Sequence, residues 1–594
     1  MEAVETANNV DSATAEGPVA ATPPVRRWSI STVAIYTVLV IVAWVGLELW
    51  GLGKAPFHTG GEPREGLVVW QMTHPTDWRD LILPRRDGPT GLELPSKPPL
   101  FHWVAALTSL VRGSTDEWSI RFPSAALSLI ALLCVFAAGG ALWSPTAGLI
   151  ATLTLMTTFE WARAATGARV DMTLTLGLVL AFLSLLFFLR SRAAGWLIPL
   201  YVGITLAVLG KGPVGAALPG FVAVVMLALT RDLSFLRQMR LGYGALVVSV
   251  VAGGWYVMAL ILGGWRFFHK QVLAENVFTF LNSQDFGGGH RHPASYLLGA
   301  LLLGLLPWTV LLPGVSVQLW HQRRQLSRHD PRLYLLVWIA VVFGFYALAA
   351  SKRGVYLLAL YPAVALLLGW WGDEQSRAPV EEGRWLARLL PFLGWLFMGL
   401  VGLVFLTALL ESLGAPLLVT VSRWLPQSAQ PFALCLSETM RAQRWLLLGL
   451  LVTAMASLYA CIRAARAARW MGIFAAVFCA AAALIMSVRQ VLLPAIAQQL
   501  SFRDFMREVR QVVRPADQLF FFNAFEYGAV FYWQDHILRY EGPWPSGAPR
   551  YLLMNKDEWD RVQPSVSDQY ERVTFADGTK ATEGPLVLIR RIGQ

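Results

Sequence analysis

The sequence predicts a polytopic α-helical membrane protein with a small α/β domain at its carboxyl end. Of its 594 residues, 55% are hydrophobic and only 15% are charged, whereas globular domains carry roughly 25% charged residues. Apolar windows of about 20 residues, long enough to cross a bilayer core of roughly 30 Å, recur along most of the chain. Short basic loops between these windows account for the net charge of +11, so we expect no nucleic-acid partner.

The amino end predicts a disordered tail followed by a first membrane span. Residues 1–25 are small, polar and mildly acidic, which is typical of a segment that does not fold. Arg26 and Arg27 then precede an apolar run over 28–50. This run is longer than the apolar core of a cleaved signal peptide. We therefore expect a transmembrane helix whose amino end lies in the cytoplasm.

Further apolar segments bring the expected number of transmembrane helices to about 13. Lys and Arg concentrate in the cytoplasmic loops of membrane proteins, and this rule sets the direction of each span. The basic loops then face the cytoplasm; they are 190–192, 231–240, 321–332 and 463–469. The expected spans after the first are 121–143, 146–165, 172–190, 194–210, 213–230, 241–263, 294–319, 333–350, 355–371, 386–411, 443–463 and 470–488.

The loop over 53–120 is expected to stay on the outer side of the membrane within a transmembrane domain of residues 26–492. Its segment "PPLFHWVAALTSLV" (98–111) is shorter than a usual span and suits a helix lying at the interface. Earlier in the loop, Pro63 of "GEPREGLVVWQM" (61–72) fits the first turn of a second interfacial helix. An odd number of spans places the carboxyl end outside.

Residues 493–594 are expected to form an extracytoplasmic α/β domain. The apolar runs "QLFFFNA", "AVFYW", "RYLLMN" and "LVLIRRI", bounded by Gly, Pro, Asn and Asp, predict strands, while "FRDFMREVRQVV" and "KDEWDRVQ" predict helices. No catalytic spacing of residues is present in this region. Its expected role is structural, or docking of an acceptor.

Charged and polar residues from five separate loops gather on the predicted outer face. Each alone has a simple explanation as a helix cap, an interfacial anchor or a snorkelling side chain. Together, carboxylates for proton transfer and Lys or Arg for an anion suit displacement of a lipid phosphate from an activated sugar. These residues are Glu62, Arg64, Glu65, Lys97, Asp171, Lys211, His269, Lys270, Glu275, His290, His292, Lys352 and Arg353.

Six motifs between residues 28 and 371 resemble, in order, a family of bacterial membrane glycosyltransferases of the GT-C type. The family is that of the aminoarabinose transferases and the protein O-mannosyltransferase-like proteins. The resemblance implies a polyprenyl-phosphate-linked sugar donor, inversion at the anomeric carbon, and an acceptor on the outer side. We expect the donor lipid to be undecaprenyl phosphate and the outer side to be the outer face of the bacterial inner membrane. The motifs are "GEPREGLVVWQM", "DWRDLILPRRDGPTGLELPSKPPLFHWVAALTSLVRG", "RFPSAALSL", "GARVDMTLT", "GKGPVGAALPG" and "SKRGVYLLALYPA".

We expect the catalytic base to be one of two carboxylates. The family's first outer loop usually carries an Asp-Glu pair, but here it reads Gly61-Glu62. A second family acid aligns with Asp171, so the resemblance implies that the base is Glu62 or Asp171. Glu65 stands where the family commonly has an aromatic residue, and Thr279 stands where we expect a family Arg.

The resemblance and the charges also assign the remaining side chains. Lys97, Lys352 and Tyr356 align with positions that the family implies for the donor phosphate, and Arg353 and Lys211 add positive charge there. The residues expected to line the acceptor or substrate cavity are Arg64, Glu65, Glu275 and His292.

We expect no required cofactor and a monomeric protein. Two histidines in one loop are more often ordinary loop residues than metal ligands, and a divalent metal at His290 and His292 is the alternative. The acceptor is lipid A, a glycan or a protein. Two other functions stay open: a transporter or flippase of lipid-linked or anionic solutes, although such proteins usually show inverted repeats, and a catalytically altered homologue that only binds acceptor.

Overall fold

The computed structural model describes most of the chain beyond the amino-terminal tail. The predicted tail (1–25), Thr279 and His290 lie outside the described residues. Those described are 29–85, 93–278, 292–377, 381–424, 426, 430–514, 517–535, 537–540, 542, 544, 549–575 and 585–592.

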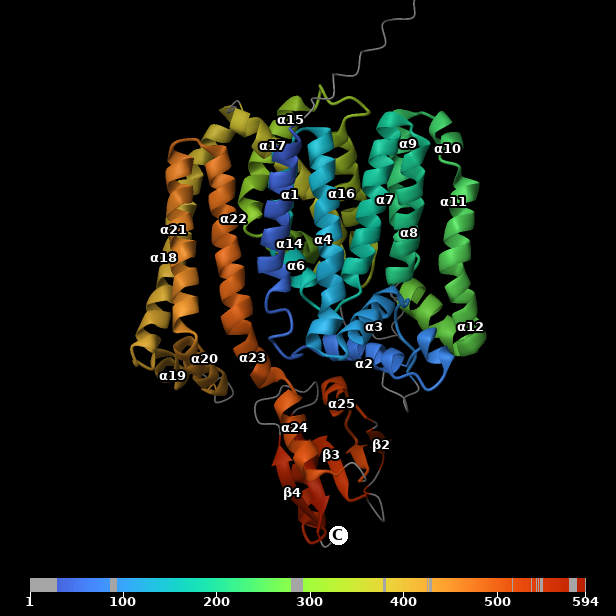
Figure 1. The fold of residues 1–594 in the computed structure, drawn as a ribbon, viewed down its shortest axis with the longest axis vertical. Coiled ribbons are helices and arrows are strands. Elements are labelled where there is room, and N and C mark those ends of the chain that lie inside the picture. Colours follow the sequence, from blue (N-terminus) through green and yellow to red (C-terminus); the bar gives the residue numbers. More distant parts are fainter. Residues whose placement is uncertain are drawn as a thin grey trace, which may run out of the picture.

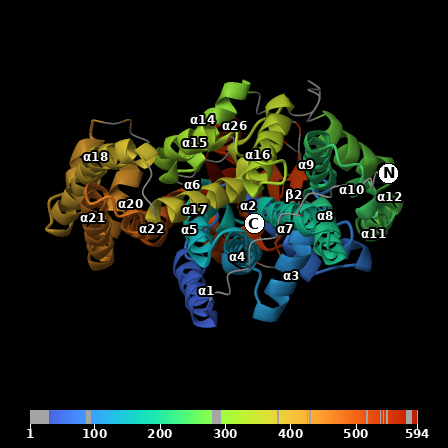
Figure 2. The ribbon, with the colours of Figure 1, turned by 90° about the horizontal axis from the view of Figure 1, so that it is seen from above.

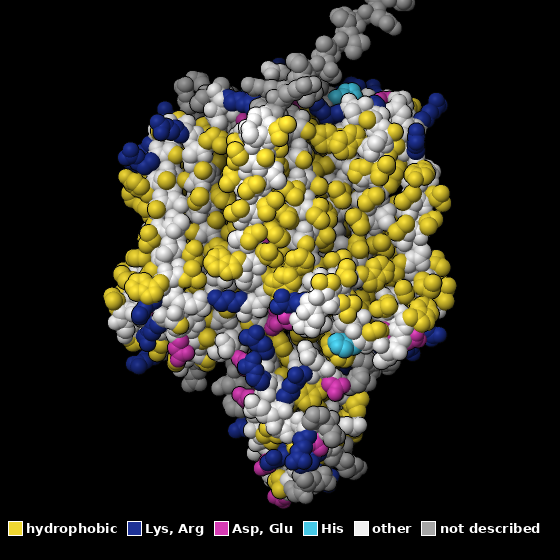
Figure 3. All heavy atoms as spheres, in the orientation of Figure 1, with side chains coloured by type: hydrophobic (Ala, Val, Ile, Leu, Met, Phe, Trp, Pro, Cys, Tyr) yellow, Lys and Arg dark blue, Asp and Glu magenta, His cyan; other side chains and the backbone are white. Residues whose placement is uncertain are grey.

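Apolar helices stand side by side in a bundle, with a small sheet domain at one end (Figure 1). The middle of the bundle presents a band of apolar side chains, whereas Lys and Arg side chains gather at its two ends (Figure 3). Seen along the bundle, α18, α20 and α21 lie at one extreme and α11 and α12 at the other (Figure 2). This is the arrangement of a multi-pass membrane protein.

Within the described residues, 10 helices are long and apolar enough to cross a membrane, or up to 11 if one bent pair is a single span. The expected number of about 13 is not reached, because two of the predicted spans correspond to shorter apolar helices, Pro145–Met156 and Val214–Thr230. The bent pair, Ala294–Gly304 with Trp308–Gln322, turns by 99°.

The helices of the bundle follow the apolar segments of the sequence. Asp116, Ser144 and Asp330 accept a backbone N–H at the start of the helix that follows each of them, as expected for amino-terminal capping residues. The helices are α1 (Ile30–Trp44), α4 (Glu117–Leu142), α5 (Pro145–Met156), α6 (Phe159–Ala165), α7 (Asp171–Ser191), α8 (Leu197–Lys211), α9 (Val214–Thr230), α10 (Ser234–Gln238), α11 (Leu241–Val248), α12 (Gly254–Phe267), α14 (Ala294–Gly304), α15 (Leu312–Gln322), α16 (Pro331–Leu348), α17 (Tyr361–Arg377), α18 (Glu381–Ser412), α19 (Leu417–Ser422), α20 (Gln430–Ala442), α21 (Arg444–Arg466), α22 (Trp470–Ser487) and α23 (Leu493–Leu500).

Two helices, α2 (Gly61–Thr73) and α3 (Leu100–Arg112), lie at the end of the bundle that carries the sheet domain (Figure 1). The 13 residues of α3 are too few to cross a bilayer core of roughly 30 Å. One face of α3 is buried, including Phe101, while Leu110 and Val111 on another face are exposed. This pattern suits a helix that rests at an interface.

We expect a reporter fused after Gly60 and one fused after Leu110 to lie on the same, outer side of the membrane. The reason is that α2 and α3 both stay at one end of the bundle, so the chain does not cross between these two points. Protease or glycosylation-site accessibility of each fusion in intact cells and in inverted vesicles measures the side. A cytoplasmic signal after Leu110 would contradict this topology.

The carboxyl-terminal domain is a five-stranded mixed sheet with strand order β2-β1-β3-β5-β4. β1 pairs in parallel with β2 and β3, and β5 runs antiparallel to β3 and β4. The predicted small α/β domain is therefore confirmed. Its elements are α24 (Arg503–Val512), β1 (Leu519–Phe522), α25 (Tyr527–Trp533), β2 (Leu538–Tyr540), β3 (Tyr551–Asn555), α26 (Lys556–Val566), β4 (Tyr570–Phe575) and β5 (Leu586–Arg591).

One of the four predicted strands in this domain is wrong. The run "AVFYW" belongs to α25 instead, and α25 packs beneath α2 (Figure 1). A methyl group added to Gly66 of α2 would lie 2.9 Å from the Phe531 ring, so the two helices meet closely because Gly66 has no side chain. Leu67 and Phe101 share a buried apolar cluster with Phe521 of the sheet. The domain and the helices α2 and α3 therefore share one core.

Candidate functional site

A cavity of about 800 Å³ opens at the end of the bundle that carries the sheet domain. Side chains enter it from the first turns of α2 and α7, the carboxyl end of α8 and the π-helical segment Phe268–Phe278. Of the residues assigned above to the base, the donor phosphate or the acceptor cavity, all except Lys352 and His292 line it. Those present are Glu62, Arg64, Glu65, Lys97, Asp171, Lys211, Glu275, Arg353 and Tyr356.

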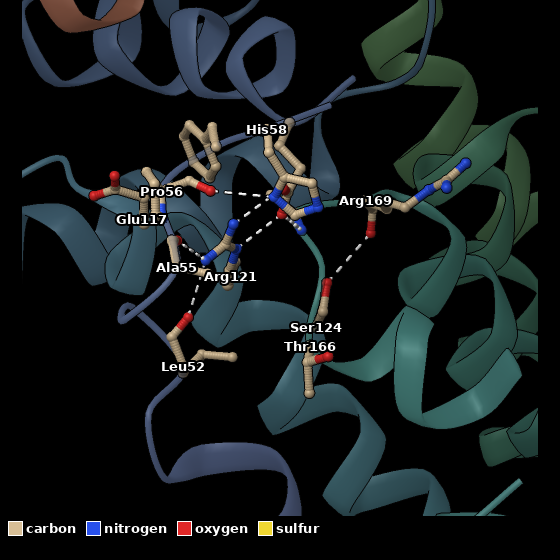
Figure 4. Close-up of polar contacts among 12 residues, drawn as sticks. Leu52, Ala55, Pro56, His58, Glu117, Arg121, Ser124, Thr166 and Arg169 are labelled. Atoms are coloured by element: carbon tan, nitrogen blue, oxygen red, sulfur yellow. Dashed lines mark hydrogen bonds and ion pairs between the residues drawn. The ribbon is translucent and has the colours of Figure 1, made fainter. Parts of the chain in front are cut away.

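Glu62 makes a two-pronged ion pair with Arg121 of α4. Nε of Arg121 lies 2.8 Å from Oε1 of Glu62, and Nη2 lies 3.0 Å from Oε2. The same guanidinium donates to the carbonyl oxygens of Leu52 and Ala55 (Figure 4), and the Ala168 N–H donates to Glu62 at 3.1 Å. Glu62 and Arg121 are both buried, so this pair ties α2 to the bundle.

The pKa of Glu62 is lower than its ordinary value. Burial opposes its ionisation, but the charge and hydrogen bonds of Arg121 and the N–H of Ala168 outweigh burial. A carboxylate held in this way binds a proton weakly. The sequence analysis did not include Arg121, although a guanidinium five residues into the helix of an apolar segment is a signal that could have found it.

Asp171, the first residue of α7, lies between two cations. Its Oδ1 is 2.5 Å from Nζ of Lys211, and its Oδ2 is 3.1 Å from Nε of Arg169. The ammonium of Lys211 also lies 4.6 Å from the centre of the Tyr356 ring. The structure thus brings Asp171, Lys211 and Tyr356 together as predicted, and adds Arg169.

Lys97 pairs with Glu275 across the cavity. Its Nζ lies 2.8 Å from Oε2 of Glu275, and about a quarter of each side chain is exposed (23% and 27%). Lys97 stands just before α3, while Glu275 comes from the segment Phe268–Phe278. Both charges therefore face the space in which a ligand would lie.

A third group of charges joins α2 to α3. Oε1 of Glu65 accepts from Nε and Nη2 of Arg64 at 3.3 and 3.1 Å. Oε2 of Glu65 lies 2.7 Å from Nε2 of His102, a buried histidine of α3. Burial opposes ionisation of Arg64, but the charge of Glu65 raises its pKa above the ordinary value. The sequence analysis missed His102, which carries no spacing signal.

Lys352 and His292 lie apart from this cavity. Lys352 lines a neighbouring cavity of about 440 Å³, and the two cavities share Arg169, Arg353 and Val355. The ammonium of Lys352 donates to the carbonyl of Ala349 at 2.6 Å. The His292 ring stacks on Tyr296, with ring centres 4.2 Å apart. Among the described residues, no cluster of three or more His, Cys, Asp or Glu side chains is arranged for a metal ion.

Comparison with known proteins places these observations in a family context. The family described as dolichyl-phosphate-mannose-protein mannosyltransferase matches residues 96–277. An undecaprenyl phosphate-α-4-amino-4-deoxy-L-arabinose arabinosyl transferase of Pectobacterium atrosepticum is 26% identical over 381 residues, which is 63% of this chain and 65% of that protein. A protein of the same description from Pseudomonas aeruginosa is 28% identical over 290 residues, which is 47% of this chain and 50% of that protein. The match thus spans less than two thirds of either relative.

A solved structure shares the fold over nearly the whole chain. The crystal structure of ArnT from Cupriavidus metallidurans bound to undecaprenyl phosphate superposes with a TM-score of 0.67 at 19% identity, covering 94% of this chain and 98% of that chain. The apo state of the same protein gives a TM-score of 0.68 at 20% identity. The predicted GT-C fold and the resemblance to the aminoarabinose-transferase-like family are therefore confirmed.

Proposed function

We propose that this protein is an inverting glycosyltransferase that moves a sugar from an undecaprenyl-phosphate-linked donor to an acceptor on the outer face of the bacterial inner membrane. One observation carries the proposal: a single cavity at one end of the bundle gathers six Lys or Arg and four Asp or Glu side chains among its described residues. The names of the curated relatives support a 4-amino-4-deoxy-L-arabinose donor as the first to test.

The excess of positive charge suits the phosphate that leaves when the sugar is transferred. Lys97, Lys211 and Arg353 enter the cavity from three separate elements. In the described arrangement Lys97 is balanced by Glu275, and Lys211 by Asp171. A phosphate that accumulates charge in the transition state gains most from fixed cations of this kind, on the order of 3 kcal/mol for each.

The neighbouring cavity supports lateral entry of the donor lipid. It lies between α6 and α14 and combines apolar side chains such as Phe159 and Leu303 with Lys352 and Arg353. Phe159 and Leu303 are exposed on the surface of the bundle, where they contact the acyl region in a membrane. The isoprenoid chain would rest on this apolar side, while its phosphate passes Arg353 into the larger cavity.

The contacts of Glu62 and Asp171 support positioning roles. Both oxygens of each carboxylate already bind cations: Glu62 holds Arg121, and Asp171 holds Lys211. Asp171 thereby fixes the ammonium of Lys211 at the edge of the cavity. The acceptor, a hydroxyl group of lipid A, a glycan or a protein, reaches the sugar from the side of the carboxyl-terminal domain, and the protein acts as a monomer.

Transfer of radiolabel from a synthetic donor tests the function. The full chain in lipid nanodiscs is incubated with undecaprenyl-phosphate-4-amino-4-deoxy-L-arabinose, labelled in the sugar, and with an envelope lipid extract as acceptor. We expect label in the acceptor and stoichiometric undecaprenyl phosphate. Movement of intact donor across a proteoliposome without release of undecaprenyl phosphate would instead identify a transporter. Acceptor binding without release of undecaprenyl phosphate would identify an acceptor-binding homologue.

A further inference from the structure

The first turns of α2 carry two cavity-lining positions on one face. Gly61 and Glu65 are four residues apart in a regular helix, so they lie one turn apart on the same side. Both line the larger cavity. The sequence resemblance implies an Asp at position 61, and Glu65 is the carboxylate that stands a single turn further along the same wall.

The carboxylate of Glu65 is supported from behind by His102. The imidazole Nε2 lies 2.7 Å from Oε2 of Glu65, and His102 is only 2% exposed. A buried imidazole requires a hydrogen-bond partner, and Glu65 provides it. The pair joins α2 to α3, so the side chain of Glu65 is held in place at the cavity wall.

The other cavity carboxylates have different surroundings. Glu62 binds a buried guanidinium through both oxygens, and its side chain is 9% exposed. Asp171 is fixed between Lys211 and Arg169 and is 7% exposed. The side chain of Glu65 is 15% exposed, and its cationic partner is the preceding residue, Arg64, which itself lines the cavity.

Glu275 is the most exposed of the four carboxylates, at 27%. Its partner is Lys97, which the proposed function assigns to the donor phosphate. Glu275 therefore stands where the phosphate would lie, on the side of the leaving group. A base for the acceptor has to stand on the opposite side of the anomeric carbon, because an inverting reaction needs in-line attack.

We propose that Glu65, positioned by His102, is the general base that takes the proton of the acceptor hydroxyl. This inference rests on the proposed function. In the transfer step the acceptor oxygen forms a bond to the anomeric carbon while the bond from that carbon to the phosphate oxygen breaks. The bonding electron pair leaves with undecaprenyl phosphate, and the hydroxyl proton moves to an oxygen of Glu65. No oxidant, metal or further reactant is needed for this balance.

The test moves the base along α2. Glu65→Gln is near-isosteric and is expected to lower kcat for sugar transfer by about a hundredfold or more, the usual contribution of a general base. Binding of undecaprenyl phosphate, used alone as the probe, is expected to stay within about twofold of wild type. Adding Gly61→Asp to Glu65→Gln is then expected to raise kcat at least about tenfold above that of Glu65→Gln alone. The added side chain fits, because a Cβ at position 61 meets no atom within 4 Å.

His102 provides the second comparison. His102→Gln keeps an N–H that can reach Glu65 and is expected to retain most of the turnover, whereas His102→Phe removes it. His102→Phe is expected to lower kcat about tenfold with an unchanged KM for the donor, as a positioning residue should. If His102 had a purely structural role, the turnover of both variants would instead fall in proportion to the fall in their melting temperatures.

The outcomes separate this inference from the proposed function. If the wild-type protein transfers sugar and Glu65→Gln keeps more than half of the turnover, Glu65 is not the base and the function stands. The inference is also overturned if the Gly61→Asp/Glu65→Gln protein folds and binds undecaprenyl phosphate but transfers sugar no faster than Glu65→Gln. A wild-type protein that releases no undecaprenyl phosphate with any donor overturns the proposed function itself.

Discussion

Replacing Glu62 with Gln is expected to cause a large loss of folded protein. The substitution leaves the guanidinium of Arg121 buried without the carboxylate that it contacts at 2.8 and 3.0 Å. Breaking a buried ion pair by removing one partner costs about 3–5 kcal/mol. The melting temperature of the detergent-solubilised protein and the yield of monodisperse protein both measure this loss.

The matched control makes the same chemical change at an exposed pair. Glu571 and Arg590 form an ion pair in the sheet domain in which the side chains are 46% and 41% exposed, and exposed pairs contribute about 1 kcal/mol or less. Glu571→Gln should therefore melt close to the wild-type temperature. A Glu62→Gln protein that melts normally but transfers no sugar would show that Glu62 acts in the reaction and not in the fold.

Acid should remove the stability that the Glu62–Arg121 ion pair contributes to the wild-type protein. The pKa of Glu62 in the folded state lies below its ordinary value of 4.5, so its contribution to stability is complete above 4.5 and is lost as the pH falls through the lower folded value. The difference in melting temperature between wild type and Glu62→Gln is therefore expected to narrow as the pH falls below 4.5. A constant difference across this range would contradict the pairing.

The second large effect is expected at Lys97. Lys97→Ala removes a cation whose ammonium faces the cavity beside Glu275, and we expect turnover to fall by about tenfold to a thousandfold, the range for losing one group that stabilises transition-state charge. Lys97→Arg keeps the charge and should retain more of the rate. Steady-state transfer kinetics, with kcat and KM measured separately, show whether the lost interaction belongs to the transition state.

A lysine outside both cavities provides the control for Lys97. Lys556 begins α26 in the sheet domain, and Lys556→Ala should leave turnover close to that of the wild type. Near-normal turnover of Lys97→Ala would reduce Lys97 to an anchor at the membrane interface. A parallel loss in both lysine variants would point to a general effect on folding instead of the donor phosphate.

Apolar length and charge placement predicted most of the fold. The spans follow directly from hydropathy, because a bilayer core demands about 20 apolar residues in a helix. The count of about 13 is not confirmed among the described residues, because length alone does not separate a short buried helix such as α5 from a full span. The strand predicted at "AVFYW" was wrong for a related reason. Five apolar residues suit a strand or one buried helical turn equally well, and the packing of this segment against α2 favours the helix.

The pairing of charges could not be read from the sequence. Glu62 and Arg121 are 59 residues apart, and Glu65 and His102 are 37 apart. These contacts depend on how α2 and α3 pack against α4 and against each other. The resemblance and the charges together assigned roles to nine of the residues that line the cavity, yet they gave no information on which cation neutralises which carboxylate.

Lys352 and Arg353 show the same limit over a shorter distance. They are neighbours in sequence, but only Arg353 lines the larger cavity. Both residues line the neighbouring cavity, so a motif that contains both does not determine which of them also reaches the larger one.

The apolar core that α2 and α3 share with the carboxyl-terminal domain sets an order of events during biosynthesis. α2 and α3 leave the ribosome early, whereas the side chains that cover them, from Phe502 onward, are made last. Until translation finishes, Leu67 and Phe101 have only the membrane surface or a chaperone to cover them. A chain that stops after α22 would carry every long apolar helix and still lack the support of the cavity wall. Maturation of this protein is thus a late event, completed only when its carboxyl-terminal domain has folded against α2 and α3.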